Sequence, residues 1–269
     1  MDYFDPYKID RSTLHPVRFS FGVVNPKQGE KVSIVAEYDM SKFPHGIALI
    51  INNESFEGKQ KRIGTAVDQR HLTHAFRYLG YNVEVHKEVD SERMMAIMSE
   101  MGKRIHDQYD SFVCCILSHG TAGHVFGTDD KKVSLDALTQ KIDAQRCPSL
   151  RNKPKLFFLQ ACRGELQEMT VAVGSDGDIR ATPDEIPQTA DFFFGHATPL
   201  GHVAWRDFNH GSWYISELCR TLCEMSTYAS LNDIMTQVCS RVASGEKYKM
   251  IGYKMTPEST TRLQGNVYF

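Results

Sequence analysis

Short runs of apolar residues alternate along the chain with segments in which apolar residues recur every three or four positions. A continuous apolar run of four to eight residues between turn-forming residues is typical of a buried strand. We predict such strands at Gly46–Asn53, Asn82–Val85, Ser111–Leu117, Lys155–Gln160, Asp191–Ala197 and Gly265–Phe269. Val125–Phe126 and Lys132–Val133 flank a turn and predict a small hairpin.

The segments between these runs have helical periodicity. We predict helices at Thr65–Leu79, Ser91–Ile105, Leu135–Ile142, Trp213–Leu222 and Leu231–Val242. Met94, Met98, Met101 and Ile105 form one stripe on the second helix, which we interpret as core packing. Strands that alternate with helices favour an α/β sandwich around a mostly parallel sheet.

Two segments lack such periodicity. The first 38 residues contain three prolines and predict a short flexible arm. Gly164–Ala190 is rich in glycine, proline and acidic residues, and a loop of that length within a compact domain is normally functional or disordered.

Composition excludes several classes of protein. The 269 residues carry 31 basic and 33 acidic side chains, so charge gives no reason to expect nucleic acid or an acidic membrane as a partner. No apolar run approaches the roughly 20 residues of a membrane-spanning helix, and the amino terminus lacks an apolar leader segment. We expect a soluble protein of the cytosol or nucleus.

The seven cysteines are odd in number and lie mostly in apolar segments, which favours reduced, buried thiols. No Cys-x-x-Cys pair occurs, so we expect neither a metal nor a cofactor. Two weaker metal hypotheses remain, Cys219 with Cys223 and His71 with His74 near Asp68, although core packing and a solvated helix face explain them more simply.

Reactive side chains follow two of the predicted strands. Ser118, His119 and Gly120 follow one, and Cys162 comes shortly after the other. Because active sites of open parallel sheets lie at the carboxyl ends of the strands, His119 and Cys162 should meet if the two strands are neighbours. A thiol beside an imidazole can form a nucleophilic thiolate near neutral pH.

The five residues QACRG at 160–164, with a histidine about 40 residues upstream, form a specific signature. From about Tyr38 to Phe269 the chain resembles the caspases, on the strings GIALIINN, FVCCILSHG, KPKLFFLQACRG, ADFFFGHAT, VAWRD and GSWYISELC in that order. The resemblance implies a three-layer sandwich whose mostly parallel six-stranded sheet has helices on both faces.

It also implies a reaction. Cys162 would be the nucleophile, His119 the general acid and base, and the backbone N–H groups of Gly120 and Cys162 the oxyanion hole. The family cleaves proteins after aspartate, the P1 residue, through a thioester acyl-enzyme, and acts in programmed cell death. The residues that match its substrate-binding set are Arg62, Gln160, Arg206, Ser118, Trp205 and Ala204.

The resemblance further implies processing and pairing. The long loop would be cut after aspartate, at Asp176, Asp178 or Asp184, to activate the zymogen. The expected divisions are an arm (1–38), a large-subunit region with the Cys-His dyad (39–176), a cleavable linker (177–190) and a small-subunit region (191–269). A homodimer of large/small pairs is expected, with the apolar end Val267–Phe269 as the edge strand that needs a partner.

Two positions depart from the family pattern. Val203 stands where an aromatic residue is common, which predicts a more open pocket for the P2 side chain. Asp207 stands where a neutral amide is usual, which predicts that an acidic P4 residue is disfavoured by like-charge repulsion. The alternative function is a catalytically silent caspase-like subunit that regulates an active caspase, and the presence of Cys162, His119 and both arginines argues against it.

Overall fold

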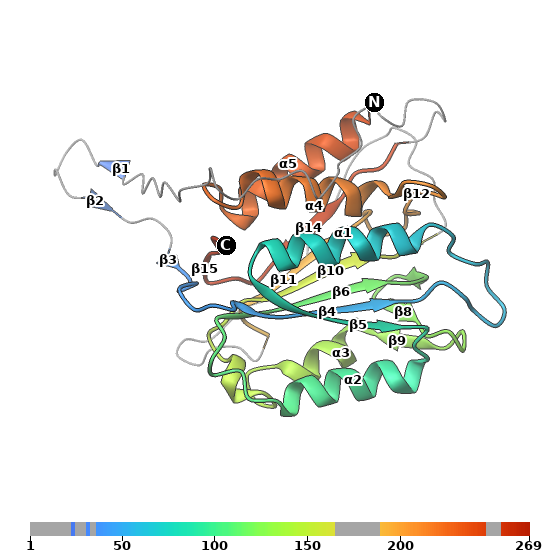
Figure 1. Cartoon of the computed structure of the whole chain (residues 1–269), viewed down its shortest axis with the longest axis horizontal. Coiled ribbons are helices and arrows are strands. Elements are labelled where there is room, and N and C mark those ends of the chain that lie inside the picture. The colour runs from blue at the N-terminus through green and yellow to red at the C-terminus, as the bar shows by residue number, and fades with distance from the viewer. Residues whose placement is uncertain (1–22, 25–30, 33–35, 165–188, 246–253) are drawn as a thin grey trace, which may run out of the picture.

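A six-stranded sheet forms the middle layer of the protein (Figure 1). The computed structural model describes residues 23–24, 31–32, 36–164, 189–245 and 254–269. The strands lie in the order β14-β11-β10-β6-β4-β5, and each neighbouring pair is parallel except β14 with β11. They are β4 (Gly46–Asn52), β5 (Tyr81–Lys87), β6 (Ser111–Leu117), β10 (Lys155–Gln160), β11 (Phe192–His196) and β14 (Glu258–Thr261).

The central strands β4, β6 and β10 are buried at every residue, as their unbroken apolar runs predict. Successive side chains point to opposite faces of the sheet. Phe157 therefore packs in the core below the sheet and Phe158 in the core above it. The five predicted strands of the parallel sheet are confirmed, with ends that differ by one or two residues.

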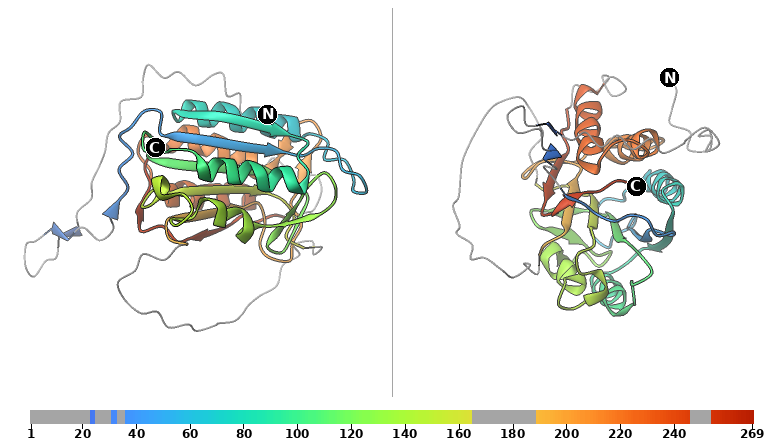
Figure 2. Two further views of the ribbon diagram at one scale, coloured as in Figure 1. Left: turned by 90° about the horizontal axis from the view of Figure 1, so that it is seen from below. Right: turned by 90° about the vertical axis from the view of Figure 1, so that its left-hand side faces the viewer.

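Helices cover both faces of this sheet (Figure 2). One layer contains α1, α4 and α5, and the other contains α2 and α3. The helices are α1 (Thr65–Tyr78), α2 (Ser91–Lys103), α3 (Leu135–Thr139), α4 (Trp213–Met225) and α5 (Leu231–Ser244). The predicted three-layer α/β sandwich is confirmed. The end of the third predicted helix is a 3-10 turn, Gln140–Ile142.

Polar side chains cap α2, α3 and α5 at their first turns. Asp90 accepts a hydrogen bond from the Arg93 N–H at 2.7 Å, and Ser230 forms a capping box with Asp233. The end of α2 corrects one prediction. The backbone becomes extended after Lys103, so Ile105 is 71% exposed and does not continue the buried methionine stripe.

The carboxyl-terminal end corrects a second prediction. Val267 is 1% exposed, and its carbonyl accepts a hydrogen bond from the Leu231 N–H, so Val267–Phe269 packs on the core instead of forming a sheet edge. The edge of the sheet on this side is β14, which is polar and largely exposed, and the opposite edge is β5. Only Gly265–Asn266 is a strand (β15), and it pairs with β3 (Ala36–Glu37). One further strand pair, β1 (Val23–Val24) with β2 (Lys31–Val32), precedes β3.

A buried ion pair joins the two parts of the chain that flank residues 165–188. Lys155 is fully buried, and its Nζ lies 3.8 Å from Asp191 Oδ2. The other oxygen of Asp191 accepts a hydrogen bond from the Tyr38 hydroxyl at 2.7 Å. Burial lowers the pKa of Lys155 to about 8, against the effect of Asp191. The start of β11 is thus anchored to β10 by side chains as well as by the sheet.

Two small strand groups lie beyond the carboxyl ends of the parallel strands. The first is β7 (Gly120–Thr121), β8 (His124–Phe126) and β9 (Lys132–Ser134), which contains the predicted hairpin. The second is the pair β12 (Arg206–Asp207) and β13 (Gly211–Ser212). Within the described ranges no helix is both long and apolar enough to cross a membrane.

Candidate active site

The carboxyl ends of β6 and β10 lie side by side, as the sequence predicts. The two strands are parallel neighbours with Leu117 opposite Gln160, and the Ser118 N–H donates to the Gln160 carbonyl at 3.2 Å. Gly120 is closely packed here, since a Cβ on it would come within 2.8 Å of the Cys162 carbonyl oxygen. The structure therefore brings the segments that carry His119 and Cys162 to one point.

A backbone carbonyl orients His119. Nε2 of the imidazole lies 2.7 Å from the Gln60 carbonyl oxygen, which can only accept, so Nε2 carries a proton. The neutral ring therefore has its lone pair on Nδ1, which suits it to take a proton from a thiol. The ring of Phe56 packs edge-on against the imidazole at 4.6 Å between centroids.

The charge state of His119 follows from its surroundings. Partial burial lowers its pKa below the ordinary value, and the positive charges of Arg62, Arg206 and Lys59 act in the same direction. The Gln60 carbonyl opposes them by stabilising the protonated form. The environment thus keeps a neutral imidazole available.

Cys162 is partly exposed, and its sulfur accepts a hydrogen bond from the Ala204 N–H at 3.4 Å. Other cysteines have a different environment: Cys114 and Cys115 are fully buried, and burial raises their pKa. Cys162 is accordingly distinguished from these core thiols by exposure and by a nearby donor.

The last two residues of QACRG hold the cysteine loop in place. Arg163 forms an ion pair with Glu258 of β14 at 2.5 Å, and its backbone N–H donates to the His202 carbonyl. A Cβ on Gly164 would overlap the backbone of Gly201. The motif therefore encodes a close approach between two loops besides the nucleophile.

Arg62 is 2% exposed, although it lies in a basic stretch of sequence. Its guanidinium donates to the Asn53 carbonyl at 2.9 Å, to Thr65 Oγ1 at 3.2 Å and to the Gln160 carbonyl at 3.4 Å. Burial, followed by repulsion from Arg206, lowers the pKa of Arg62 to about 9. This guanidinium is still positively charged at neutral pH.

Arg206 is the second cation of the site. Its Nε donates to the Ile63 carbonyl at 2.8 Å, which places it beside the Arg62 segment. A buried carboxylate, Asp68 on α1, acts electrostatically on both arginines and accepts hydrogen bonds from the backbone N–H and hydroxyl of Ser212 at 2.6 and 2.5 Å. Burial raises the pKa of Asp68 to about 6, against the effect of Ser212 and the arginines.

The Gln160 side chain adds a polar group to this cluster. It is 1% exposed, and its Oε1 has no hydrogen-bond partner among the described residues. A buried amide without a partner is costly, and substrate-binding sites are where such groups are expected. Ser118 differs, because its hydroxyl donates to the Phe126 carbonyl at 2.6 Å and so ties β8 to the site.

The segment that precedes Arg206 packs on the core. Ala204 and Trp205 are partly buried against it, and Trp205 stacks on Trp213 with ring centroids 6.5 Å apart. Asp207 is turned into its own loop: one carboxylate oxygen accepts from the backbone N–H groups of Asn209 and His210 and from His210 Nδ1, at 2.8 to 2.9 Å.

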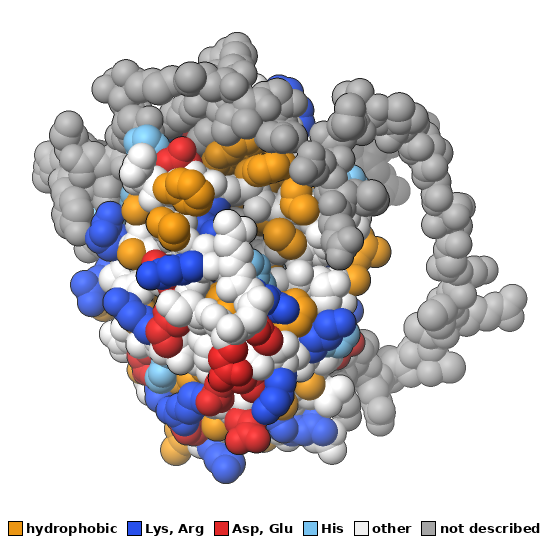
Figure 3. Space-filling view, turned by 90° about the vertical axis from the view of Figure 1, so that its right-hand side faces the viewer, with side chains coloured by type: hydrophobic (Ala, Val, Ile, Leu, Met, Phe, Trp, Pro, Cys, Tyr) orange, Lys and Arg blue, Asp and Glu red, His pale blue; other side chains and the backbone are white. Residues whose placement is uncertain are grey.

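Figure 3 looks onto this end of the molecule. Hydrophobic side chains gather on the upper part of the view, and basic and acidic side chains mingle below them. Ile63 and Phe208, which flank the two arginines in sequence, are 47% and 63% exposed.

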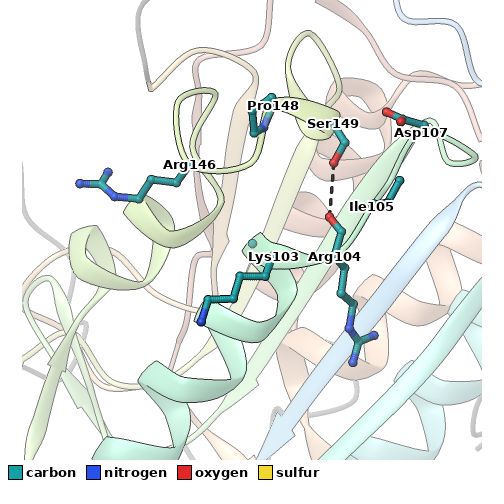
Figure 4. A pocket seen from close by; sticks show the side chains of 8 residues that line it. Lys103, Arg104, Ile105, Asp107, Arg146, Pro148 and Ser149 are labelled. Atoms are coloured by element: carbon teal, nitrogen blue, oxygen red, sulfur yellow. Dashed lines mark hydrogen bonds between the residues drawn. The ribbon is translucent and has the colours of Figure 1, made fainter.

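A separate pocket of about 540 Å³ lies at the opposite end of the sheet (Figure 4). It is formed where α2 ends and where the chain approaches the start of β10. Its lining residues are Gly102, Lys103, Arg104, Ile105, Asp107, Arg146, Pro148 and Ser149. Both arginines already form ion pairs, Arg104 with Glu84 and Arg146 with Asp143, so we assign no ligand to it.

Several contributors have no sequence signal of their own. The Gln60 carbonyl and the Ala204 N–H are backbone groups, which any residue type supplies. Asp68 reads as an ordinary polar position of an amphipathic helix. The described residues contain no group of three or more His, Cys, Asp or Glu side chains that could hold a metal ion. The candidate processing sites Asp176, Asp178 and Asp184 lie outside the described residues.

Comparisons with known proteins agree with this geometry. The family model described as "Caspase domain" matches residues 45–268. The chain is 35% identical over 215 residues to caspase-3 of Bos taurus, an alignment that covers 79% of this chain and 78% of the relative.

The chain belongs to the caspase family. It is 38% identical over 193 residues to human caspase-10, which covers 70% of this chain and 37% of that protein. It is also 32% identical over 271 residues to caspase-8 of Mus musculus, in an alignment that covers 91% of this chain and 55% of that protein. Membership places this caspase among the cysteine peptidases. Its mixed sheet between two helical layers is the fold expected of a caspase.

Proposed function

We propose that this caspase is a cysteine endopeptidase that cleaves proteins after aspartate, with Cys162 as nucleophile and His119 as general acid and base. The observation that carries the proposal is the arrangement beside Cys162 of two guanidiniums, Arg62 and Arg206, with the buried side chain of Gln160, whose Oε1 has no hydrogen-bond partner among the described residues. This cluster lies in a site that also has an oriented imidazole.

Charge selects the P1 residue. Arg62 and Arg206 share one buried carboxylate, Asp68, so at neutral pH the cluster holds one positive charge in excess. A carboxylate from the substrate would balance this charge and pair with the guanidiniums in the bidentate geometry that arginine favours. A neutral P1 side chain would leave the charge buried and uncompensated, which makes discrimination steep.

The reaction follows acyl transfer. His119 Nδ1 takes the proton of Cys162, and the thiolate attacks the carbonyl carbon of the P1 residue. The N–H groups of Gly120 and Cys162 stabilise the oxyanion. His119 then protonates the leaving amine, and water hydrolyses the thioester with His119 as base. The Gln60 carbonyl supports the imidazolium that forms in each half-reaction.

We further propose activation by cleavage after Asp176, Asp178 or Asp184, which would separate a large-subunit region from a small-subunit region beginning near 191. The contacts between β10 and β11 and the Lys155–Asp191 pair support this proposal, since they would hold the two parts together after the cut. A homodimer of such pairs, joined through the exposed edge of β14, is the proposed assembly. The names of the relatives favour a role in apoptosis.

The test compares two partly exposed cysteines. Wild-type protein, Cys162→Ala and the control Cys239→Ala are assayed on fluorogenic tetrapeptides that differ only in P1: Asp, Asn, Glu and Lys. We expect wild type and Cys239→Ala to cleave the P1 Asp peptide selectively, and Cys162→Ala to be inactive. Fragment sizes on the same samples report self-processing.

Folded, linker-cut protein that cleaves no P1 Asp peptide would support the alternative, a silent subunit that regulates an active caspase. In that case, mixing it with an active caspase should change the rate of the active partner. Cleavage that persists in Cys162→Ala would contradict the assignment of the nucleophile.

A further inference from the structure

The chain between β4 and α1, residues 53–64, supplies two parts of the proposed active site. We call this segment the active-site loop. The Gln60 carbonyl accepts the hydrogen bond that orients His119, and Arg62 supplies the buried guanidinium. Arg62 is held by three hydrogen bonds of its own guanidinium. The position of Gln60 must depend on other contacts.

A carboxylate from the β8–β9 turn contacts the loop two residues before Gln60. Oδ2 of Asp130 accepts a hydrogen bond from the Gly58 N–H, and Oδ1 lies 3.8 Å from Lys59 Nζ. Lys59 Nζ also lies 4.2 Å from the centroid of the Phe126 ring. The neighbouring Glu57 N–H donates to the Thr128 carbonyl at 3.0 Å. The turn thus contacts three successive loop residues.

The backbone of Asp130 is in an unfavourable conformation. Its φ is +57°, in the left-handed region that disfavours side chains other than those of glycine and, to a lesser degree, asparagine and aspartate. Glycine would relieve this strain but would supply no carboxylate to Gly58 and Lys59. Backbone strain that persists in a folded protein is often found at functional sites.

A second strained residue holds the other end of the loop. Glu88 has a φ of +51°, and its two carboxylate oxygens accept hydrogen bonds from the backbone N–H groups of Glu54 and Ser55, both at 3.0 Å. Two of the four non-glycine residues with positive φ in the described part of the chain therefore bind N–H groups of this loop. The two contacts come from different segments, which are joined to each other by a hydrogen bond from the Thr128 N–H to the Val89 carbonyl at 3.1 Å.

We propose that Asp130 is a positioning residue for catalysis: by holding Gly58 and Lys59 it places the Gln60 carbonyl against His119, and Glu88 supports the loop from its other end. The inference rests on the proposed function of the site. Because Arg62 has its own anchors, loss of the Asp130 contact should affect the orientation of His119 more than binding of the P1 carboxylate. It should lower kcat and leave KM nearly unchanged.

The test uses two substitutions at Asp130 and a matched control. Asp130→Gly removes the carboxylate and relieves the strain, whereas Asp130→Asn keeps an oxygen acceptor and tolerates positive φ. The control is Asn152→Gly: Asn152 has a φ of +58° and is exposed, and it lies in the turn before β10. All three are compared with wild type in thermal unfolding and in kcat and KM on the P1 Asp peptide.

We expect Asp130→Gly to lower kcat about tenfold with KM changed less than threefold, while its Tm stays equal to wild type or rises. Asp130→Asn should recover at least half of the wild-type kcat. Asn152→Gly should keep full activity with an equal or higher Tm. Wild-type kcat in Asp130→Gly would overturn the proposal, and so would a loss of kcat that follows a fall in Tm in both Asp130 variants.

A second readout separates this proposal from the proposed function. The rate at which iodoacetamide alkylates Cys162, read by intact mass with Cys162→Ala as the blank, reports on thiolate formation by His119 without any peptide. Asp130→Gly should slow it and Asp130→Asn should restore it. If wild type cleaves no P1 Asp peptide but shows this pattern, the proposed function fails and the positioning role stands. Equal alkylation rates would overturn the positioning role.

Discussion

Nε2 of His119 lies 2.7 Å from the carbonyl oxygen of Gln60, which is 59 residues earlier in the chain. This contact determines which ring nitrogen carries the proton and leaves the lone pair on Nδ1, as the proposed proton exchange with Cys162 requires. Burial of His119 and the nearby positive charges of Arg62 and Arg206 disfavour the imidazolium. The pH dependence of the reaction should report this balance.

We expect the acid limb of the kcat/KM profile on a P1 Asp peptide to have its midpoint below pH 6.5, the ordinary pKa of histidine. The midpoint is expected on the acid side of 6.5 because the pKa of His119 is lowered, and an imidazole that binds its proton less tightly stays neutral to lower pH. The profile is measured from pH 5 to 8 at constant ionic strength. A midpoint above 6.5 would show that the thiolate stabilises the imidazolium more strongly than burial and the arginines disfavour it.

Asp68→Asn should lower the unfolding free energy and disturb Arg62 and Arg206, the two arginines proposed to bind the P1 carboxylate. The change keeps the shape of the side chain but removes the buried negative charge shared by Arg62 and Arg206. Removing one partner of a buried charge cluster costs about 3 kcal/mol of unfolding free energy, but the raised pKa of Asp68 shows that burial of its own charge is unfavourable, so we expect a net loss below that figure. Urea denaturation at pH 7.5, where Asp68 is ionised, measures the loss.

The control for this change is Asp136→Asn, which removes an exposed carboxylate in the first turn of α3. It should lose no more than about 1 kcal/mol, the usual size of a charge interaction with a helix end. Equal stability losses in the two variants would mean that Asp68 is not the buried counter-charge of the arginines.

Asp207→Asn should relax the expected selection against an acidic P4 residue. The carboxylate is partly exposed. Burial is the largest single influence on its pKa and raises it, but the hydrogen bonds from Asn209 and His210 together outweigh burial and lower the pKa. Interactions between exposed charges are worth about 1 kcal/mol or less, so kcat/KM for a P4 Asp peptide should rise about threefold to fivefold relative to a P4 Leu peptide.

Added salt provides the check on this interpretation. At 0.5 M NaCl the difference between wild type and Asp207→Asn should shrink, because exposed charges are screened. The ratio of kcat/KM for the P4 Asp peptide to kcat/KM for the P4 Leu peptide is compared at low salt. If Asp207→Asn leaves this ratio unchanged, the P4 side chain does not lie near Asp207.

Much of the fold could be predicted from particular runs of residues. The apolar strings at Ser111–Leu117 and Lys155–Gln160 are buried central strands, and the spacing of Leu231, Ile234 and Val238 gives a helix face that is buried in the structure. Burial on both faces leaves few polar positions in a strand, here only at the strand ends, and burial on one face leaves a period of 3.6 in a helix.

The errors concern the ends of the chain and the ends of elements. Val267–Phe269 is apolar and suggested a strand edge, but it packs on the core near Leu231, while the polar residues Glu258–Thr261 form the edge. An exposed edge tolerates polar side chains, so apolar character does not identify it. Ile105 fits the helical period yet lies beyond the last turn of α2.

The sequence by itself determined the chemistry that depends on residue type, the thiol of Cys162 and the imidazole of His119, and placed each at the carboxyl end of a strand. The tertiary structure decided that these two strands are neighbours. Only the tertiary structure decided which groups surround them. The Gln60 carbonyl, the Ala204 N–H and the buried charge of Asp68 come from segments far apart in the chain. Local patterns record how deeply a segment is buried, whereas these contacts depend on how distant segments dock.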